Sequence, residues 1–500
     1  MPKTNNIDTF DDIDKVERGI ERKRQLAKTR AGQKTAKNKR GDKRTAGEKN
    51  AAGEKKVAGG KRIADNKKAT NNKHATKRNS TGKMILKVLG IILGIGILAI
   101  MIYGIRLWLS YNGFLDKITG NEPEMKEYSV IVLNSSNTNE IRELERKNLG
   151  FLKTDPKAGN AEQYLQTVVK FEPSYYDDPV TISEVLNGRI SDGIVLDSEW
   201  ISAMSEATES AMANARVIYT FSIPLEEEDT PIEEKDVTKE PFAVLISGSD
   251  SRAGVKATAR SDVNIVAVIN PAQGKILLVS IPRDTYVQLH GTTGLKDKLT
   301  HAGVYGINMS KQTIEDFLGV KINDTLKVSF DTVIKVVDQL DGIEIDSDKE
   351  MTLKAEGKDK TCHFSVGKQK VDGDCALRFA RERKSYETGD RHRGENQQQV
   401  ITSIIGKLSS AKQYVLKLPT ILDIAADSFE TSLSRDEIAA FIRMQLAGGT
   451  KWQVKSIAID GTGTMLPTYS MGANLPLYVM IPSDATVAEA QSQINKYLSE

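Results

Sequence analysis

One long apolar run limits what this chain can fold into. Residues 84–109 contain only two charged side chains, Lys87 and Arg106, and residues 88–105 contain none. A helix over this stretch, rising about 1.5 Å per residue, is long enough with its flanks to cross a bilayer core of roughly 30 Å. The run lies too far from the N-terminus to be a cleaved signal peptide. We therefore expect a transmembrane helix over residues 84–109, with a buried core helix as the alternative.

The charges on the two sides of this run differ in sign. Residues 1–83 carry 25 Lys and Arg against 10 Asp and Glu, whereas residues 110–500 carry 43 against 57. Basic segments stay on the cytoplasmic side of a membrane helix. We therefore expect a single-pass protein of the cell membrane, with its N-terminus in the cytoplasm and its C-terminal domains outside.

The basic arm over residues 1–83 has too few apolar residues to bury a core, so it is predicted to be disordered. One interpretation is that the arm is attracted to anionic lipid heads or to an acidic cytoplasmic partner. The alternative is that it is a solvated tail that only sets the topology. Aromatic residues do not alternate with the basic ones, so we do not expect nucleic acid as a partner.

Strand and helix signals alternate after a stalk over residues 110–126. Residues 127–225 hold apolar runs such as YSVIVLN and DGIVLD, and helical stretches such as TNEIRELERKN and AEQYLQTVVKF. This alternation predicts an α/β accessory domain, in which we find no catalytic constellation. Residues 226–240 carry so many charges that we expect a linker too charged to pack.

A predicted hairpin places charged side chains together. Apolar strands over residues 263–269 and 275–281 are joined by five residues, a connection that favours an antiparallel hairpin. The charged residues at its open end are Arg260, Asp262, Arg283 and Asp284.

This charged rim has two interpretations. It is either a set of surface salt bridges, which stabilise a protein little, or a binding site. Asp250 joins the rim if residues 242–246 form a strand of the same sheet. Asp250 and Asp262 supply hard oxygen ligands for a cation, and arginine side chains suit phosphate oxygens. The mixture of residue types therefore favours a binding site.

A helix predicted near residues 393–408 carries polar residues on its buried face. Its apolar residues lie on one side, namely Val400, Ile401, Ile404, Ile405 and Leu408. At about 100° per residue, Arg393 and Gln397 fall on the same side, whereas Asn396 and Gln399 fall outside it. Buried polar groups need partners, and helix N-termini attract anions. Arg393 and Gln397 are therefore predicted to face a ligand rather than water.

Arg381 and Arg383 can serve one site only where the chain between them is extended, since on a helix they would point in opposite directions. We expect the preceding helix, at roughly residues 374–381, to unwind there, because residues 385–389 are turn-like.

Cys362 and Cys375 are the two cysteines of the chain. Both lie beyond the predicted membrane helix, where disulfides persist. We hypothesise that they pair, which would close a loop of about 13 residues and stabilise the fold by roughly 3 kcal/mol.

Seven motifs in this order resemble the LytR-CpsA-Psr family, most closely its CpsA-like capsule branch. They are LISGSDSR (245–252), ARSDVNIV (259–266), SIPRDTYV (280–287), KDKLTHAGVYG (296–306), VVDQLDGIEI (336–345), ALRFARERKSYETGDRHRGENQQQVI (376–401) and YSMGANLPLYVMIP (469–482). One departure is Asp341, which stands where the family commonly has a second glycine.

The resemblance implies an α/β (α+β) fold in which a mixed central sheet is flanked by helices that form a pocket for a lipid tail. Its catalytic domain would span residues 241–450, with residues 451–500 as a C-terminal extension packed on it. The implied activity is that of a Gram-positive, extracytoplasmic, Mg²⁺-using phosphotransferase. It would move a glycopolymer from an undecaprenyl-pyrophosphate carrier to a peptidoglycan hydroxyl through a phosphodiester. The implied partners are that lipid-linked polymer, peptidoglycan, membrane lipid and capsule or wall assembly proteins.

The resemblance also implies roles for single residues. Asp250 and Asp262 correspond to the magnesium-associated carboxylates. The pyrophosphate clamp would consist of Arg260, Arg283, Arg381, Arg383 and Gln397, with Lys298 as a weaker candidate. Asp390 and Arg393 would form a supporting acid–base pair, and either Asp390 or Asp262 would act as general base.

Two other functions fit the same sequence. A polyprenyl-pyrophosphate phosphatase or pyrophosphatase would use the same clamp with water as the acceptor. A non-enzymatic regulator of capsule or wall synthesis, of the transcriptional-attenuator type, would act through the basic arm or the accessory domain. Residues 1–83 contain no helix-turn-helix pattern, which speaks against direct DNA reading. Capsule polysaccharide, teichoic acid and other wall glycans all fit as the polymer.

Overall fold

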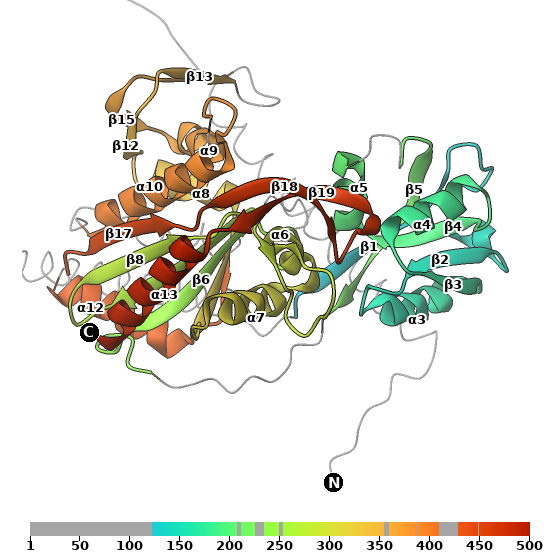
Figure 1. The fold of residues 1–500 in the computed structure, drawn as a ribbon, viewed down its shortest axis with the longest axis horizontal. Helices are drawn as coiled ribbons and strands as arrows, with labels where there is room; N and C mark the ends of the chain where they lie inside the picture. The colour runs from blue at the N-terminus through green and yellow to red at the C-terminus, as the bar shows by residue number, and fades with distance from the viewer. Residues whose placement is uncertain are drawn as a thin grey trace, which may run out of the picture. The chain divides into compact units, whose positions relative to one another are not determined.

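The computed structural model describes residues 123–207, 212–225, 235–249, 254–354, 360–387, 389–409, 429–448 and 450–500 (Figure 1). The predicted basic arm, the predicted transmembrane helix and most of the predicted stalk lie outside these residues. Within the described ranges, no helix is both long and apolar enough to span a bilayer.

Residues 123–225, which we call the N-terminal module, form a five-stranded mixed sheet in the order β3-β2-β4-β1-β5. Its strands are β1 (Met125–Leu133), β2 (Asn148–Leu152), β3 (Glu172–Tyr176), β4 (Gly193–Asp197) and β5 (Ala215–Pro224). Its helices are α3 (Ala158–Val168), α4 (Pro179–Asn187) and α5 (Ser198–Ala207). Strand β1 lies between β4 and β5 and pairs antiparallel with both.

One helix predicted in this module does not form. Residues 138–148 (TNEIRELERKN) were expected to be helical, but only the short 3₁₀ turn η1 (Ile141–Leu144) is present, and Asn148 already begins β2. Leu144 alone of the four turn residues is buried. The segment therefore lacks the apolar stripe that would hold a longer helix against the sheet.

The remaining described residues are built around a six-stranded mixed sheet in the order β16-β11-β6-β7-β8-β17. Its strands are β6 (Phe242–Ser249), β7 (Val263–Asn270), β8 (Lys275–Ser280), β11 (Asp324–Ser329), β16 (Phe429–Thr431) and β17 (Gln453–Ala458). The predicted hairpin is confirmed, because β7 and β8 pair antiparallel from Asn270 with Lys275 to Ile265 with Ser280. Strands β11 and β17 run parallel to their neighbours β6 and β8. The predicted mixed α/β class is also confirmed.

Both faces of this second sheet are buried. Leu277 and Val279 face α7 (Ile307–Leu318) and α13 (Asp484–Ser499) in one apolar cluster. The intervening residues Ile276 and Leu278 belong to a cluster on the opposite face, with side chains from α8 (Phe330–Gln339), α9 (Gly373–Arg381) and α10 (Asp390–Ser409). Strands that are covered on both faces are apolar in continuous runs instead of alternating, as residues 265–269 and 276–279 are.

Shorter elements surround this sheet. The two-stranded pairs are β9 (Tyr286–Val287) with β10 (Asp297–Lys298), β12 (Ile343–Ser347) with β15 (Gly367–Val371), β13 (Met351–Lys354) with β14 (Thr361–Phe364), and β18 (Gly461–Thr468) with β19 (Gly472–Pro482). The further helices are α6 (Leu299–Ala302), η2 (Gly303–Tyr305) and α12 (Arg435–Gly448). Cys362 of β14 and Cys375 of α9 form a disulfide, with their Cα atoms 5.6 Å apart.

The turn before β12 gives a physical reason for the departure at Asp341. Asp341 has φ of 57° and Gly342 has φ of 81°, so the chain takes two consecutive left-handed residues. Glycine adopts this conformation without strain, and aspartate is among the few other residues that tolerate it. The substitution therefore keeps the turn.

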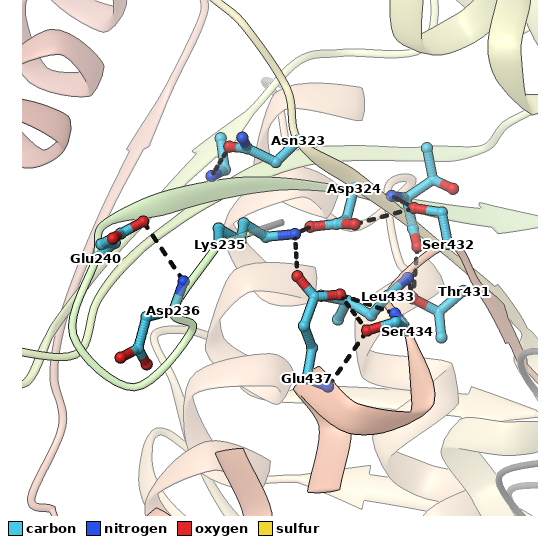
Figure 2. A network of polar contacts seen from close by, with 12 residues as sticks. Lys235, Asp236, Glu240, Asn323, Asp324, Thr431, Ser432, Leu433, Ser434 and Glu437 are labelled. Carbon is cyan, nitrogen blue, oxygen red and sulfur yellow. Dashed lines mark hydrogen bonds and ion pairs between the residues drawn. The ribbon is translucent and has the colours of Figure 1, made fainter. Parts of the chain in front are cut away.

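The prediction that the linker stays unpacked is wrong for its last residues. Lys235 lies 2.7 Å from Asp324 Oδ2 and 2.7 Å from Glu437 Oε1, so it joins β11 to α12 (Figure 2). Val237 is buried in a small apolar cluster beside them. Burial acts to lower the pKa of Lys235, but hydrogen bonds to Asp324 and Glu437 raise it overall. Charges do not prevent packing here because each has a partner.

Candidate active site

The open end of the β7–β8 hairpin holds a chain of ion pairs. Asp262 directly precedes β7, and its Oδ1 accepts a 2.8 Å hydrogen bond from Arg283 Nη1, just beyond β8. Arg283 Nε lies 3.7 Å from Asp284 Oδ2, and Lys298 of β10 forms an ion pair with Asp284 Oδ1. Three of the four charges expected at this end are therefore together.

The N-terminal end of α10 lies against this hairpin end. Arg393 Nη2 is 2.6 Å from Asp390 Oδ1. Arg393 and Gln397 are each 8% exposed, which confirms that both lie on the buried side of the helix. A small pocket, the polar pocket, is lined by side chains from both elements: Asp262, Arg283, Asp390, Arg393 and Gln397. Residues far apart in sequence thus form one charged site.

A glycine permits this close approach. A Cβ atom at Gly394 would lie 2.9 Å from Ser280 Oγ at the end of β8, closer than Cβ atoms normally come to another atom. Glycine allows the first turns of α10 to lie directly on the strand. The sequence around Gly394 does not predict this role, because nothing in the neighbouring residues signals which strand the helix contacts.

The electrostatics of the polar pocket are set by burial and by opposed charges. Burial raises the pKa of the Asp390 carboxyl, with Arg393 opposing and Asp284 adding to that rise. Burial lowers the pKa of Arg393. Burial also acts to lower the pKa of Arg283, but Asp262 and Asp284 raise it overall. Both arginines remain cations, since a guanidinium does not lose its proton in proteins.

Two donors in the polar pocket have no hydrogen-bond partner. The Nε–H groups of Arg283 and Arg393 are buried and donate no hydrogen bond to any described residue. Buried donors of this kind are rare in folded proteins and call for a ligand or water. A phosphate oxygen is a fitting acceptor, because forked guanidinium groups bind phosphate strongly.

Arg381 and Arg383 flank the point where α9 ends. Glu382 between them is extended, with φ of −70° and ψ of 129°, so the helix unwinds where the sequence predicted. The Arg381 guanidinium lies 5.0 Å from the centre of the Phe330 ring. Arg383 is near enough to Asp390 to oppose the rise in its pKa. Arg383 therefore adds positive charge beside the polar pocket, whereas Arg381 lies over the Phe330 ring.

An apolar cavity of about 230 Å³ adjoins the polar pocket. Its walls come from the second sheet, with Ile246, Val263, Leu326 and Val328, and from α8, α9 and α10, with Val333, Leu377 and Ile401 among others. Arg381 and Gln397 line it as well, and Gln397 also lines the polar pocket. One side chain therefore borders a charged site and an apolar one.

Not every predicted residue lies in the polar pocket. Asp250 lies outside the described residues. Arg260 is not among the residues that line the pocket, and its Nε is 3.4 Å from Glu199 Oε2 of α5. Lys298 reaches the site only through Asp284.

The expectation that Asn396 lies off the buried side of α10 is wrong. Asn396 and Gln398 are both buried. Asn396 Nδ2 donates to the Phe379 carbonyl at 3.0 Å, and Gln398 Nε2 donates to the carbonyls of Leu278 and Ile457 at 3.1 and 2.7 Å. The first half of α10 is therefore enclosed on several sides. The run of amides from Asn396 to Gln399 was the available signal, since amides satisfy backbone groups that a strand edge or helix end leaves open.

The residues present fit Mg²⁺ only in part. Asp262 offers a carboxylate at the site, and Mg²⁺ commonly takes one or two carboxylates and keeps several waters. Within the described ranges, however, no three His, Cys, Asp or Glu side chains are grouped closely enough to hold a metal.

Comparison with known proteins defines the family of this chain. The sequence model of the LytR_cpsA_psr family matches residues 202–480, more than half of the chain. The chain therefore belongs to the LytR_cpsA_psr family, as its motifs indicated.

Curated relatives of this chain have related names. It is 35% identical over 230 residues to the polyisoprenyl-teichoic acid–peptidoglycan teichoic acid transferase TagU of Enterococcus faecalis, over 45% of this chain and 72% of that protein. It is 32% identical to the corresponding transferase TagV of Bacillus subtilis, over 46% of this chain and 59% of that protein. The crystal structure of B. subtilis TagV aligns with a TM-score of 0.44 and 28% identity, over 52% of this chain and 98% of that one.

Proposed function

We propose that this protein is a membrane-anchored, extracytoplasmic phosphotransferase that moves a glycopolymer from an undecaprenyl-pyrophosphate carrier to peptidoglycan. The observation that most directly supports this proposal is that Gln397 lines both the polar pocket and the apolar cavity. A ligand that fills both must have an anionic group joined directly to an apolar chain. A polyprenyl pyrophosphate has this composition, and the names of the transferase relatives favour a teichoic acid as the attached polymer.

The proposed reaction breaks the phosphoanhydride bond of the pyrophosphate and forms a phosphate ester bond. A peptidoglycan hydroxyl attacks the phosphorus that carries the polymer, and the bridging oxygen leaves with the polyprenyl monophosphate. The product is a phosphodiester between polymer and peptidoglycan, and the hydroxyl proton passes to a base. Transfer of this kind depends mostly on positioning and on neutralising charge, which is the work that Arg283 and Arg393 would do.

Asp390 is the stronger of the two candidates for the base. Its pKa is raised by burial, and a carboxylate with a raised pKa accepts a proton more readily. Both carboxylates are paired with an arginine, Asp390 with Arg393 at 2.6 Å and Asp262 with Arg283 at 2.8 Å, so the choice rests on the burial of Asp390. Asp262 would help to hold Mg²⁺ together with Asp250. When bound, Mg²⁺ would neutralise charge on the pyrophosphate oxygens.

The proposed location follows from the sequence. The apolar run over residues 84–109 would anchor the chain, with the basic arm in the cytoplasm and the site outside. In this orientation the site would lie on the side of the membrane where peptidoglycan lies.

The proposal is tested by transfer of a labelled lipid-linked polymer to peptidoglycan, with the full chain in proteoliposomes. Arg283→Ala is expected to lower the transfer rate by about 10²–10³-fold, as loss of a transition-state donor does elsewhere. The exposed Arg142→Ala serves as the matched control and is expected to leave the rate unchanged. Release of phosphate without any label in peptidoglycan would refute the transferase and favour the phosphatase. Full transfer by Arg283→Ala would refute the site.

A further inference from the structure

Arg260 is one of the predicted clamp residues that do not line the polar pocket, and its surroundings link two parts of the chain. The segment just before Arg260 is hydrogen-bonded to the start of β1 in the N-terminal module. Met125 N donates to the Lys256 carbonyl at 2.8 Å, and Thr258 N donates to the Met125 carbonyl at 2.9 Å. Met125 and Ala257 form a parallel β-bridge. The backbone before Arg260 is thus held by the N-terminal module.

Helix α5 of that module is also packed against the second part of the chain. Trp200 meets His301 edge to face, with ring centres 5.1 Å apart, and lies in one apolar cluster with Val304, Met471 and Leu477. Nearby, Lys327 of β11 forms a buried ion pair with Glu124, whose Oε2 accepts a 2.8 Å hydrogen bond from Ile307 N. These contacts keep the first turn of α5 in one position relative to the second sheet.

The first turn of α5 presents Glu199 to Arg260. Asp197 Oδ1 accepts a 2.8 Å hydrogen bond from Glu199 N, and Asp197 is itself held 3.2 Å from the buried Lys126 Nζ. Glu199 Oε2 lies 3.5 Å from Arg260 N and 3.4 Å from Arg260 Nε. The side chains of Arg260 and Glu199 are 18% and 25% exposed, so water screens this pair only in part. One carboxylate oxygen thus faces both the backbone and the side chain of Arg260.

We infer that Glu199 is a positioning residue, through which the N-terminal module orients Arg260 for the pyrophosphate of the donor. This inference rests on the proposed function. A carboxylate at the Nε edge orients the plane of a guanidinium, and an arginine that is already oriented loses less conformational freedom when a phosphate binds. Glu199 lies before residue 202, where the family match begins. The N-terminal module would therefore complete a site that the matched region does not hold in place by itself.

The test measures binding of undecaprenyl pyrophosphate in detergent micelles to the full chain, together with transfer kinetics. Glu199→Ala is expected to weaken binding, and to raise the KM for the donor, by about two- to tenfold, because one long side chain must then be ordered on binding. The kcat is expected to change much less. Glu199→Gln should restore much of the binding, since its amide oxygen still accepts hydrogen bonds.

A matched control and a double variant sharpen this test. Glu184→Ala, an exposed acid on α4 of the same module, is expected to bind like the wild type. In an Arg260→Ala background, Glu199→Ala should add nothing, because a residue that acts through Arg260 has no effect without it. Additive losses, unchanged binding, or tighter binding in Glu199→Ala would each overturn the inference.

The experiments distinguish a failure of this inference from a failure of the proposed function. If Arg260→Ala weakens donor binding and Glu199→Ala does not, the positioning role of Glu199 is refuted and the pyrophosphate site stands. If Arg260→Ala binds the donor like the wild type, Arg260 is no clamp residue and the positioning role is refuted with it. If the wild type binds the donor but transfers nothing to peptidoglycan, the proposed transferase is refuted, while the binding measurements still decide the role of Glu199.

Discussion

Two clusters of charge in this protein differ in how their groups are paired. In the N-terminal module, the fully buried Lys126 Nζ lies 3.0 Å from Asp155 and 3.2 Å from Asp197, and Tyr128 Oη donates to Asp155 at 2.7 Å. Each charge of this buried ion cluster contacts an opposite charge, and Asp197 Oδ2, which accepts no hydrogen bond from a described residue, still faces Lys126 Nζ. In the polar pocket, Arg283 and Arg393 each keep a buried Nε–H that donates to no described residue.

The difference separates a structural cluster from a binding site. In the buried ion cluster the charges are paired with one another, so the cluster holds strands and helices in place, and a ligand could enter only by breaking an ion pair. The polar pocket lowers stability, because its donors without a hydrogen-bond partner have lost their hydration. Such a site is retained where a ligand supplies the missing acceptors. The two clusters should therefore respond in opposite ways to substitution: one through stability, the other through function.

The largest effect is expected in the buried ion cluster. Lys126→Met would leave Asp155 and Asp197 buried without a cation, which should lower the free energy of unfolding by about 3–5 kcal/mol. The measurement is denaturant unfolding of the full chain. Lys153→Met removes the surface ion pair with Asp177, in which Lys153 is 54% exposed, and serves as the control. If Lys126→Met loses no more stability than the control, the buried ion cluster has no structural role beyond that of a surface ion pair.

The disulfide lies in neither cluster and should affect stability alone. Replacing Cys362 and Cys375 together by alanine is expected to lower the free energy of unfolding by roughly 3 kcal/mol, because the cross-link restricts the unfolded chain. The same unfolding experiment checks this, and donor binding measured well below the midpoint should stay unchanged. Labelling of two free thiols in the native wild-type protein without reductant would contradict the pairing.

The polar pocket should respond to a change of shape at constant charge. Arg393→Lys keeps the positive charge but loses the fork, so transfer is expected to fall about 10- to 100-fold, the value of one hydrogen bond to a charged group. Stability should change little. Transfer kinetics and unfolding are measured together, with Arg142→Lys as the exposed control. Wild-type transfer by Arg393→Lys would show that charge alone is required.

The buried ion cluster should also give a pH dependence of stability, through Asp197. Burial raises the pKa of its carboxyl to about 7, against the opposing attraction of Lys126. The folded state therefore holds this proton more tightly than the unfolded chain, so the free energy of unfolding should fall as the pH rises from about 4 to about 7. The Asp197→Asn variant keeps a side-chain oxygen that can accept from Glu199 N but has no titrating carboxyl. The free energy of unfolding of this variant should fall less over that pH range. Parallel pH profiles for the two proteins would exclude the effect.

Parts of the site could be predicted because they depend on short stretches of chain. A hairpin with a five-residue connection places Asp262 opposite Arg283 whatever surrounds it, and the structure has that contact at 2.8 Å. The 3.6-residue period of α10 placed Arg393 and Gln397 on the buried side for the same reason. The period could not reveal that Asn396 is also buried, because it does not say how many sides of a helix are covered.

Other features depend on which surfaces meet, and no local pattern carries that information. Local sequence patterns predicted the hairpin and the polar side of α10, because strand and helix periods are properties of neighbouring residues. The mixed central sheet was expected from the family resemblance. Only the tertiary structure decided that α10 lies on the end of β8, that Lys235 packs between Asp324 and Glu437, and that Glu199 faces Arg260. These contacts join distant residues, and they form because burying shared apolar surface brings the elements together and leaves their charges to find partners.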